Sequence, residues 1–500
     1  MTKSIPLRSA ASAIALLCAT TANADVSAAE VWADWQESLA IYGTEGVSIG
    51  TETMSGDTLT VSDLSLIIED DMTKVTAEMG VLTFTELGDG TVSVAMPTSY
   101  PILIENADGN TIKMTTSQSG LKMIVSGTAA QMNYAVSADQ YAIKIDEITE
   151  DGMPIKADIR VVVNNLAGSY ATSTGDLREI TYDMTAASVD MLADIAPPET
   201  AGDYVTLSGK IEGLATTAEM TLPLADDMED PEDLFKNGFA MTAGYTYQKG
   251  AYIFDVNSEG EQTAGSASTG TGSLAVEMSG QNMSYDSNVT NAAISLQGAS
   301  LPFPVEISIA EYGFGIDVPL AKSDEPADFG LRLNLTDFAV NDMIWMMADP
   351  TNTIPHDPAT ILLDLSGKAK LFFDLLDSEQ AEAMEDAEMP AEVNALTLNN
   401  LQLKAAGVDV SGNGAFTFDN TDMVTFEGYP RPTGDLTLNV KGANALIDNL
   451  IKMGILPEDQ AMFGRMMMGS FTQVTGDDEL TSKIEINDQG NISANGQKIQ

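Results

Sequence analysis

Apolar and polar residues alternate with a period of two through most of the chain between Thr58 and Ile309. The stretches TLTVSDLSLII, VLTFTELGDGTVSVAM and IKADIRVVV show this pattern, and turns such as Gly88-Asp89-Gly90 separate them. A period of two is typical of a strand with one buried and one solvated face, and GDG between two such runs indicates a hairpin. The pattern predicts a mainly β protein with a few short helices (α+β), built as a long curved antiparallel sheet or an open barrel.

A small number of segments follow the period of a helix instead. In residues 27–39, Ser27 and Glu30 form a capping box, and Val31, Trp35 and Leu39 fall on one face. We expect this helix to dock on the edge or mouth of the sheet, although its two tryptophans are also compatible with a binding face. Further helices are predicted over residues 231–236, 342–348, 378–389, 443–453 and 457–468.

The stretch from Phe329 to Leu371 combines a strand, a short apolar helix, a proline-rich loop and a second strand. Residues 434–486 follow the same order more loosely, with a strand, an apolar helix, a proline corner, an extra helix and a strand. We therefore expect two related strand-helix-strand units. In both of them the helix should bury its apolar stripe against one face of the sheet, and Trp345 should be buried with it.

A chain of 500 residues exceeds one ordinary core, so two or three domains or one elongated body are expected. Residues 1–24 are interpreted as a signal peptide, and residues 25–257 as an N-terminal helix followed by an antiparallel strand-rich region. Residues 258–273, SEGEQTAGSASTGTGS, are small and polar, which predicts a flexible loop and a soft boundary. Residues 274–500 form a second strand-rich region with the two strand-helix-strand units.

The first residues have the pattern of a secretory signal. A basic start and an apolar run over residues 14–17 precede the small-x-small sequence Ala22-Asn23-Ala24. Lipid attachment at Cys18 would need a small residue before it, whereas Leu17 stands there. No later segment approaches the length of a transmembrane helix. These features predict a soluble periplasmic protein that is cleaved near Ala24.

The charge of the chain restricts its partners. It has 74 acidic and 23 basic residues, and the signal holds two of the basic ones, so the mature charge is 21 − 74, or −53. Such a surface repels nucleic acid and anionic headgroups. No calcium-binding loop accompanies the acidic residues. We interpret the excess of acids as a solvated surface, with no nucleic-acid partner.

Candidate catalytic residues are few. The only histidine, His356, lies between Pro355 and Asp357, and no G-x-S-x-G sequence occurs, so we interpret it as a loop histidine. Ser119 and Lys122 have S-x-x-K spacing, but they lie between strand patterns rather than on a helix. Two facing carboxylates remain compatible with the many acids, although no pair stands out. No catalytic residue is assigned, and the ligand-binding residues are unknown.

The sequence offers few residues that could bind a metal ion or a cofactor. One histidine and no cysteine after the cleavage site can hardly supply a zinc site. Methionine clusters at residues 343, 346 and 347 and at residues 466–468 could hold copper, but short apolar helices use methionine more often to fill core space. We therefore expect both clusters to pack in the core, with no metal site and no cofactor.

Several sequences resemble an alphaproteobacterial periplasmic family called domain of unknown function 2125. They are LPFPVEI (from Leu301), IPHDPATILLDLSGKAKL, RPTGDLTLNVKG, ILPEDQAMFGRMM and the closing ELTSKIEINDQGNISANGQKI. This resemblance covers most of the mature chain and is best in its C-terminal half. It implies no activity, because the family has none assigned. AAGVDVSGNGAFTFD is also similar, more weakly, to AsmA-type envelope proteins, which implies a long curved sheet that handles lipids.

Two functional hypotheses from different classes follow. The first is an exported, non-enzymatic cell-envelope protein that binds a lipid or other apolar ligand along a curved sheet, or scaffolds envelope assembly. The second is a carboxylate-based hydrolase acting on cell-wall or polysaccharide material. A greasy groove on the sheet would favour the first, and a polar cleft with two facing carboxylates would favour the second. A purely structural module stays open if the chain's own side chains fill the concave face.

The signal sequence generates the first testable prediction. When the full chain is expressed in a Gram-negative host, the mature N-terminus should be Asp25 and the protein should be recovered in the soluble periplasmic fraction. N-terminal sequencing by mass spectrometry checks the cleavage site. Incorporation of a labelled lipid precursor at Cys18 would contradict the interpretation.

Overall fold

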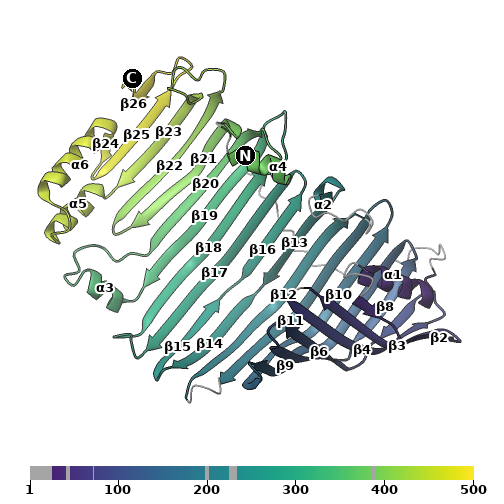
Figure 1. Ribbon diagram of the computed structural model, residues 1–500. Coiled ribbons are helices and arrows are strands. Elements are labelled where there is room, and N and C mark those ends of the chain that lie inside the picture. Colours follow the sequence, from purple (N-terminus) through teal and green to yellow (C-terminus); the bar gives the residue numbers. More distant parts are fainter. Residues whose placement is uncertain are drawn as a thin grey trace.

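The computed structural model describes residues 25–40, 46–70, 72–196, 202–223, 233–385, 387 and 389–499. Within these residues, 27 strands form one long antiparallel sheet that does not close into a barrel (Figure 1). The mainly β prediction is confirmed, and the long sheet is the correct alternative. The predicted signal peptide and Cys18 lie outside the described residues.

The N-terminal end of the sheet consists of short strands. They are β1 (Val47–Ser48), β2 (Thr51–Ser55), β3 (Thr58–Glu69), β4 (Thr73–Glu86), β5 (Val92–Ala95), β6 (Ser99–Asn106), β7 (Thr111–Ser119) and β8 (Lys122–Thr128). Glu86 of β4 pairs with Val92 of β5, so the hairpin predicted at GDG is confirmed.

Fifteen strands build the body of the sheet, and neighbours in space are mostly neighbours in sequence. They are β9 (Gln131–Glu150), β10 (Met153–Thr174), β11 (Arg178–Ala196), β12 (Tyr204–Leu222), β13 (Ala240–Tyr247), β14 (Lys249–Ser258), β15 (Glu261–Thr269), β16 (Gly272–Ser279), β17 (Asn282–Gly298), β18 (Val305–Pro319), β19 (Ala327–Val340), β20 (Ala359–Leu371), β21 (Ala391–Ala405), β22 (Val408–Asp419) and β23 (Arg431–Lys441). The far end holds β24 (Gln473–Gly476), β25 (Glu479–Ile486), β26 (Ile492–Ala494) and β27 (Gln497–Lys498).

The prediction of a flexible loop over residues 258–273 is wrong. Most of this stretch is β15, which pairs with β14 on one side and with β17 on the other. Gly265, at the centre of β15, is small because large neighbours occupy the space above it. A Cβ atom at Gly265 would lie 2.6 Å from Phe254 Cζ and 2.9 Å from Leu296 Cδ2. The sheet is continuous here, and the division into two regions stays a prediction.

Several long strands bend at a residue in the left-handed conformation. In β19, Leu335 pairs with Ile361 and Phe338 with Ala359, so three residues on β19 span the same distance as two on β20. Asp337, with φ 52°, is the extra residue of this β-bulge. A bulge bends the strand and increases its twist, and it also keeps Leu335 and Phe338 on one face. Left-handed residues also occur within β10, β12 and β17, at Asn165, Gly213 and Asn291, where the pairing register with the neighbouring strand does not shift.

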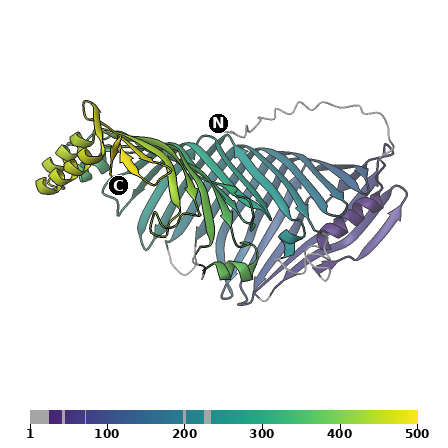
Figure 2. The ribbon, with the colours of Figure 1, turned by 90° about the horizontal axis from the view of Figure 1, so that it is seen from above.

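The described helices are α1 (Ala28–Ala40), α2 (Asp233–Lys236), α3 (Asp342–Ala348), α4 (Ser378–Glu385), α5 (Ala443–Lys452) and α6 (Glu458–Phe471). Their positions confirm the helix predictions, with ends shifted by a few residues. In Figure 2 the sheet curves along its length, with α1 near one end and α5 and α6 at the other. The capping box is present: Ser27 N–H donates to Glu30 Oε2 at 2.8 Å and Glu30 N–H to Ser27 Oγ at 3.3 Å.

The helix α1 docks on the N-terminal end of the sheet, as one of the two interpretations predicted. Trp32, which is 3% exposed, and Trp35 both pack against Phe84, with ring centroids 5.7 and 5.6 Å apart. Leu59, Val61 and the other members of this core lie on β3 to β9 below the helix. The largest buried cluster among the described residues is therefore at this end.

Both strand-helix-strand units are present, but their helices do not behave as expected. The first runs β19, α3, β20 and the second runs β23, α5, α6, β24, β25, with β19 paired to β20 and β23 to β25. Neither α3 nor α5 has a buried residue, and Trp345 is only half-buried. The predicted burial of the apolar stripes is wrong for these helices, because they extend past the strand ends, where no sheet surface lies beneath them (Figure 1).

The packing under α1 generates a stability prediction. Phe84→Ala removes a fully buried ring that both α1 tryptophans contact, and it should lower the free energy of unfolding of this end by about 3–5 kcal/mol. Tryptophan fluorescence during urea unfolding measures the loss. Met72→Ala, at a site 74% exposed, is the matched control and should change little. Equal stability of the two variants would contradict the docking of α1.

Candidate functional site

The two faces of the sheet differ in chemistry, and strand pairing assigns residues to them. Directly paired residues project on the same side of a sheet, and successive residues on opposite sides. On β19, Leu331 and Leu333 lie on one side, which we call the apolar face, and Arg332 and Asn334 lie on the other, the polar face. In a strand that contains a bulge or a left-handed residue, the face of a residue follows from its direct partner on the next strand.

One line of direct partners crosses almost the whole sheet on the apolar face, and we call it the apolar row. Every member is aliphatic, aromatic or glycine. In spatial order the row is Val92, Val125, Tyr134, Tyr170, Tyr182, Ala218, Ala243, Val276, Tyr285, Ile316, Leu331, Leu365, Leu398, Gly414, Leu436 and Ile484. With strands about 4.8 Å apart, the row is roughly 70 Å long.

Helix α1 covers only the start of the apolar row. Val92, Val125 and Tyr134 are at most 2% exposed, but among the described residues no helix packs on the rest of this face. Large apolar side chains there are more than a third exposed, namely Ile143, Val161, Val205, Leu207, Tyr245, Ile294, Tyr312, Ile361, Val393 and Leu403.

Glycines opposite aromatic rings shape the apolar face. Phe329 pairs with Gly367, and a Cβ atom on that glycine would lie 2.3 Å from Phe329 Cζ. Tyr252 lies over Gly209 in the same manner, with a Cδ1 distance of 2.7 Å. The rings therefore lie across the neighbouring strand instead of standing upright. This arrangement gives a low, continuous apolar surface.

A buried polar cluster closes the covered end under α1. Arg178 is 4% exposed and donates from Nη2 to Asp34 Oδ1 at 3.0 Å and to Ser38 Oγ at 2.8 Å. Tyr134 Oη donates to Asp34 Oδ2 at 2.6 Å. Burial raises the pKa of Tyr134 well above its ordinary value, and the Asp34 carboxylate adds to this effect. The cluster joins α1 to β9 and β11, and no sequence motif indicated it, since its members are up to 144 positions apart.

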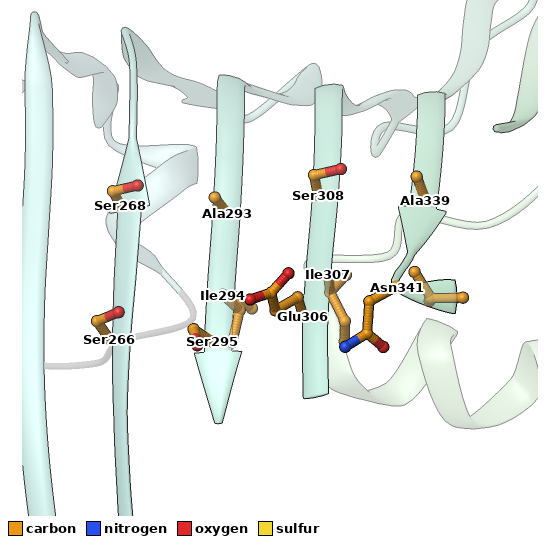
Figure 3. Close-up of a pocket in the computed structure, with 11 residues that line it drawn as sticks. Ser266, Ser268, Ala293, Ile294, Ser295, Glu306, Ile307, Ser308, Ala339 and Asn341 are labelled. Carbon is orange, nitrogen blue, oxygen red and sulfur yellow. The ribbon is translucent and has the colours of Figure 1, made fainter. Parts of the chain in front are cut away.

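The polar face carries ion pairs and shallow depressions. Arg332 pairs with Asp286, and Lys368 Nζ lies 2.7 Å from Asp328 Oδ1. One depression, with a volume of about 340 Å³, is lined by small side chains that lie side by side across neighbouring strands (Figure 3). Glu306 is the only acid in its lining. This depression lacks the two facing carboxylates that a hydrolase would need.

A second depression on the polar face, of about 650 Å³, has more acids in its lining. They are Asp317, Asp328 and Asp364. The carboxylate of Asp328 pairs with Lys368, and that of Asp364 accepts a hydrogen bond from Asn399 Nδ2 at 3.0 Å. Two of the three acids are therefore paired with side chains of the neighbouring strand.

His356 packs in the loop after α3, as interpreted from the sequence. Its ring stacks on Trp345 with centroids 4.3 Å apart and an interplanar angle of 6°. Its Nε2 lies 3.4 Å from Asp349 Oδ2, which also accepts from the backbone N–H of Ile354 at 2.8 Å. Burial by itself would raise the pKa of Asp349, but these hydrogen bonds and that from Thr351 outweigh it and hold the pKa below its ordinary value. The carboxylate organises the loop.

The other candidates lie apart from one another. Ser119 ends β7 and Lys122 begins β8, so neither is on a helix. The methionine clusters are not core residues, and that prediction is wrong. Met346, Met347 and Met466 are 55, 70 and 60% exposed. In the part of the chain that the structure describes, no three His, Cys, Asp or Glu side chains converge as a metal site.

Comparison with known families assigns the C-terminal half. Residues 248–494 match the model of DUF2125, an uncharacterized protein conserved in bacteria. This region belongs to the DUF2125 family. The family region runs from β14 to β26 and includes both strand-helix-strand units, whereas α1 and its core lie before it. No curated protein and no solved structure matches the chain.

The described helices are all short, both in the DUF2125 region and in the part of the chain before it. None of them is both long enough and apolar enough to cross a membrane. The weaker likeness to AsmA-type proteins is not tested by these comparisons and stays a prediction.

The buried polar cluster generates a second stability prediction. Asp34→Ala leaves Arg178 without its main partner and should cost about 3–5 kcal/mol of unfolding free energy, whereas Asp34→Leu combined with Arg178→Met should cost much less. Urea unfolding followed by the α1 tryptophans measures both. Asp158→Ala removes a partner of an exposed pair with Arg160 and should have little effect. A double variant at least as unstable as Asp34→Ala would contradict this account.

Proposed function

We propose that this is an exported cell-envelope protein without enzymatic activity, which holds an apolar ligand, such as the acyl chains of a lipid, along the apolar face. The observation that carries the proposal is the apolar row, which continues across the sheet long after the cover of α1 has ended. Exposed contiguous apolar surface on this scale is typical of a binding surface. The signal pattern supports export to the periplasm.

Acyl chains fit this surface better than a polar ligand does. They need no hydrogen-bond partners, and the apolar row supplies none apart from tyrosine hydroxyls. The low surface formed where Phe329 and Tyr252 lie over glycines also suits an extended chain. From Tyr170 to Ile484 the row crosses 13 strands, or roughly 60 Å at about 4.8 Å per strand. This length exceeds the ~30 Å hydrocarbon core of a bilayer, so the surface can hold several acyl chains in sequence.

The charge distribution supports a soluble carrier. Ion pairs such as Arg332–Asp286 and Lys441–Glu479 occupy the polar face and keep it hydrated. A large net negative charge opposes association between copies of the chain. The polar face can therefore face water while the apolar face holds its ligand.

A fluorescent fatty acid and lipid mass spectrometry test the proposal. The chain without residues 1–24 should bind the fatty acid from solution and should retain lipids after purification. Leu403→Glu places a charge at a 42% exposed position of the apolar face and should weaken binding by about tenfold or more, because a carboxylate against an acyl chain is poorly solvated. Gln402→Glu introduces the same charge on the polar face and is the control, which should bind normally.

Circular dichroism establishes that both variants keep the sheet. Equal binding by Leu403→Glu and Gln402→Glu, or the absence of any binding by the parent protein, would overturn the proposal.

A further inference from the structure

The apolar stripe of α6 faces water instead of the protein. Met462, Phe463 and Met466 are 72, 60 and 60% exposed, and Met467 and Phe471 follow at 43 and 39%. Their spacing places the five within one half of the helix circumference. The helix is held through its other side, where Ala461 is buried and Arg465 donates from Nη2 to Asp448 Oδ1 of α5 at 2.7 Å. This is the reverse of the usual orientation of an amphipathic helix, whose apolar stripe faces the core.

The short helix α3 repeats this arrangement. Met343, Met346 and Met347 share one side and are 40, 55 and 70% exposed. The helix is attached through Trp345, which stacks on His356. The two exposed apolar helices thus occur in the two strand-helix-strand units.

Both helices lie at the same edge of the sheet. Between β19 and β23 the strands reverse direction four times, so these two strands run the same way. Because α3 follows the end of β19 and α5 and α6 follow the end of β23, all three helices project from the same row of strand ends (Figure 1). The loop that contains Val424 and Tyr429, between β22 and β23, lies at the opposite edge.

The chemistry of these stripes fits a lipid surface. The apolar stripe of α6 consists of methionine and phenylalanine, and the exposed acids Glu458 and Asp459 are confined to the first turn of the helix. Flexible methionine adapts to an irregular apolar environment. An apolar helix side at a surface is the feature by which helices lie in a bilayer interface. The strongly acidic chain repels anionic headgroups, so the surface it fits is an uncharged, zwitterionic one.

We propose that α6, with α3 beside it, docks this edge of the sheet on a zwitterionic lipid bilayer, from which the ligand reaches the apolar face. The inference rests on the proposed function, since an acyl chain leaving a bilayer needs an apolar path that avoids water. The docked edge places the strand ends, and with them the C-terminal part of the apolar face, next to the hydrocarbon. The helices supply attachment, and the apolar face holds the ligand.

Flotation with phosphatidylcholine vesicles tests the docking. The parent protein should float with the vesicles. The triple variant Phe463→Ser, Met466→Ser, Met467→Ser should lower the vesicle-bound fraction about tenfold or more, because it replaces three of the five exposed apolar side chains of α6 with polar ones. Val424→Ser with Tyr429→Ser is the control. It removes side chains that are 88 and 75% exposed at the opposite edge, and it should float like the parent.

Two further measurements separate this inference from the proposed function. The triple variant should still bind a monomeric fluorescent fatty acid from solution, while Leu403→Glu should still float with vesicles. Light scattering without lipid should give the same mass for the parent and the triple variant. Flotation of the triple variant at the parent level, or no flotation of the parent, would overturn the docking. A parent dimer that the triple variant converts to monomer would overturn it in favour of contact between two copies.

Discussion

Hydrogen bonding between neighbouring strands is the interaction on which the rest of this structure depends. Outside the α1 end, the described part of the chain has no second layer, so the backbone ladder carries what a packed core carries in a compact domain. A ladder of this kind holds only if every strand keeps its register, because a shift by one residue would move the apolar residues to the wet face. At the bulge, Asp337 is the extra residue, and the residues on either side of it stay paired with β20 and keep their apolar side chains on the same face.

This construction leaves the apolar residues on one face of the sheet without a covering layer. The alternation places apolar residues on one face, and burial of such residues is the main favourable contribution to folding, yet α1 covers only the first members of the apolar row. An apolar ligand would bury these side chains by forming the missing layer. At the N-terminal end α1 supplies this second layer, and the buried core cluster lies there, with Trp32 and Phe84 in contact.

The helices complement the sheet in two opposite ways. At one end, α1 turns its apolar side inward and is fastened by Arg178 and Asp34. At the far end, α6 turns its polar side toward α5 and leaves Phe463 in water. A closed end and an exposed, apolar end are what an elongated carrier needs if its ligand enters from a lipid surface and is retained along the sheet.

The strands, the antiparallel class and the helix positions could be predicted from the sequence, because each depends on a local period that neighbouring residues share. Leu331, Leu333 and Leu335 indicate by alternation alone that they share a face. The alternation could not tell whether another layer covers that face, since covered and uncovered apolar strands have the same pattern. For a related reason, the sequence predicts a loop over residues 258–273, where the structure has a strand. A run of small residues by itself indicates a flexible segment, whereas Gly265 is small because Phe254 and Leu296 lie over it.

Only the tertiary structure decided which side of each helix meets the protein. The periodicity of α6 is that of a core helix, but the strand ends stop before it, so Met466 has no sheet to pack against and remains 60% exposed. The contact of Arg178 with Asp34 is likewise a tertiary outcome, because 144 positions separate the two residues and no local rule relates them. The sequence by itself determined the alternation that makes one face apolar. The three-dimensional arrangement determined that this face stays open, because it alone decides what lies above each strand.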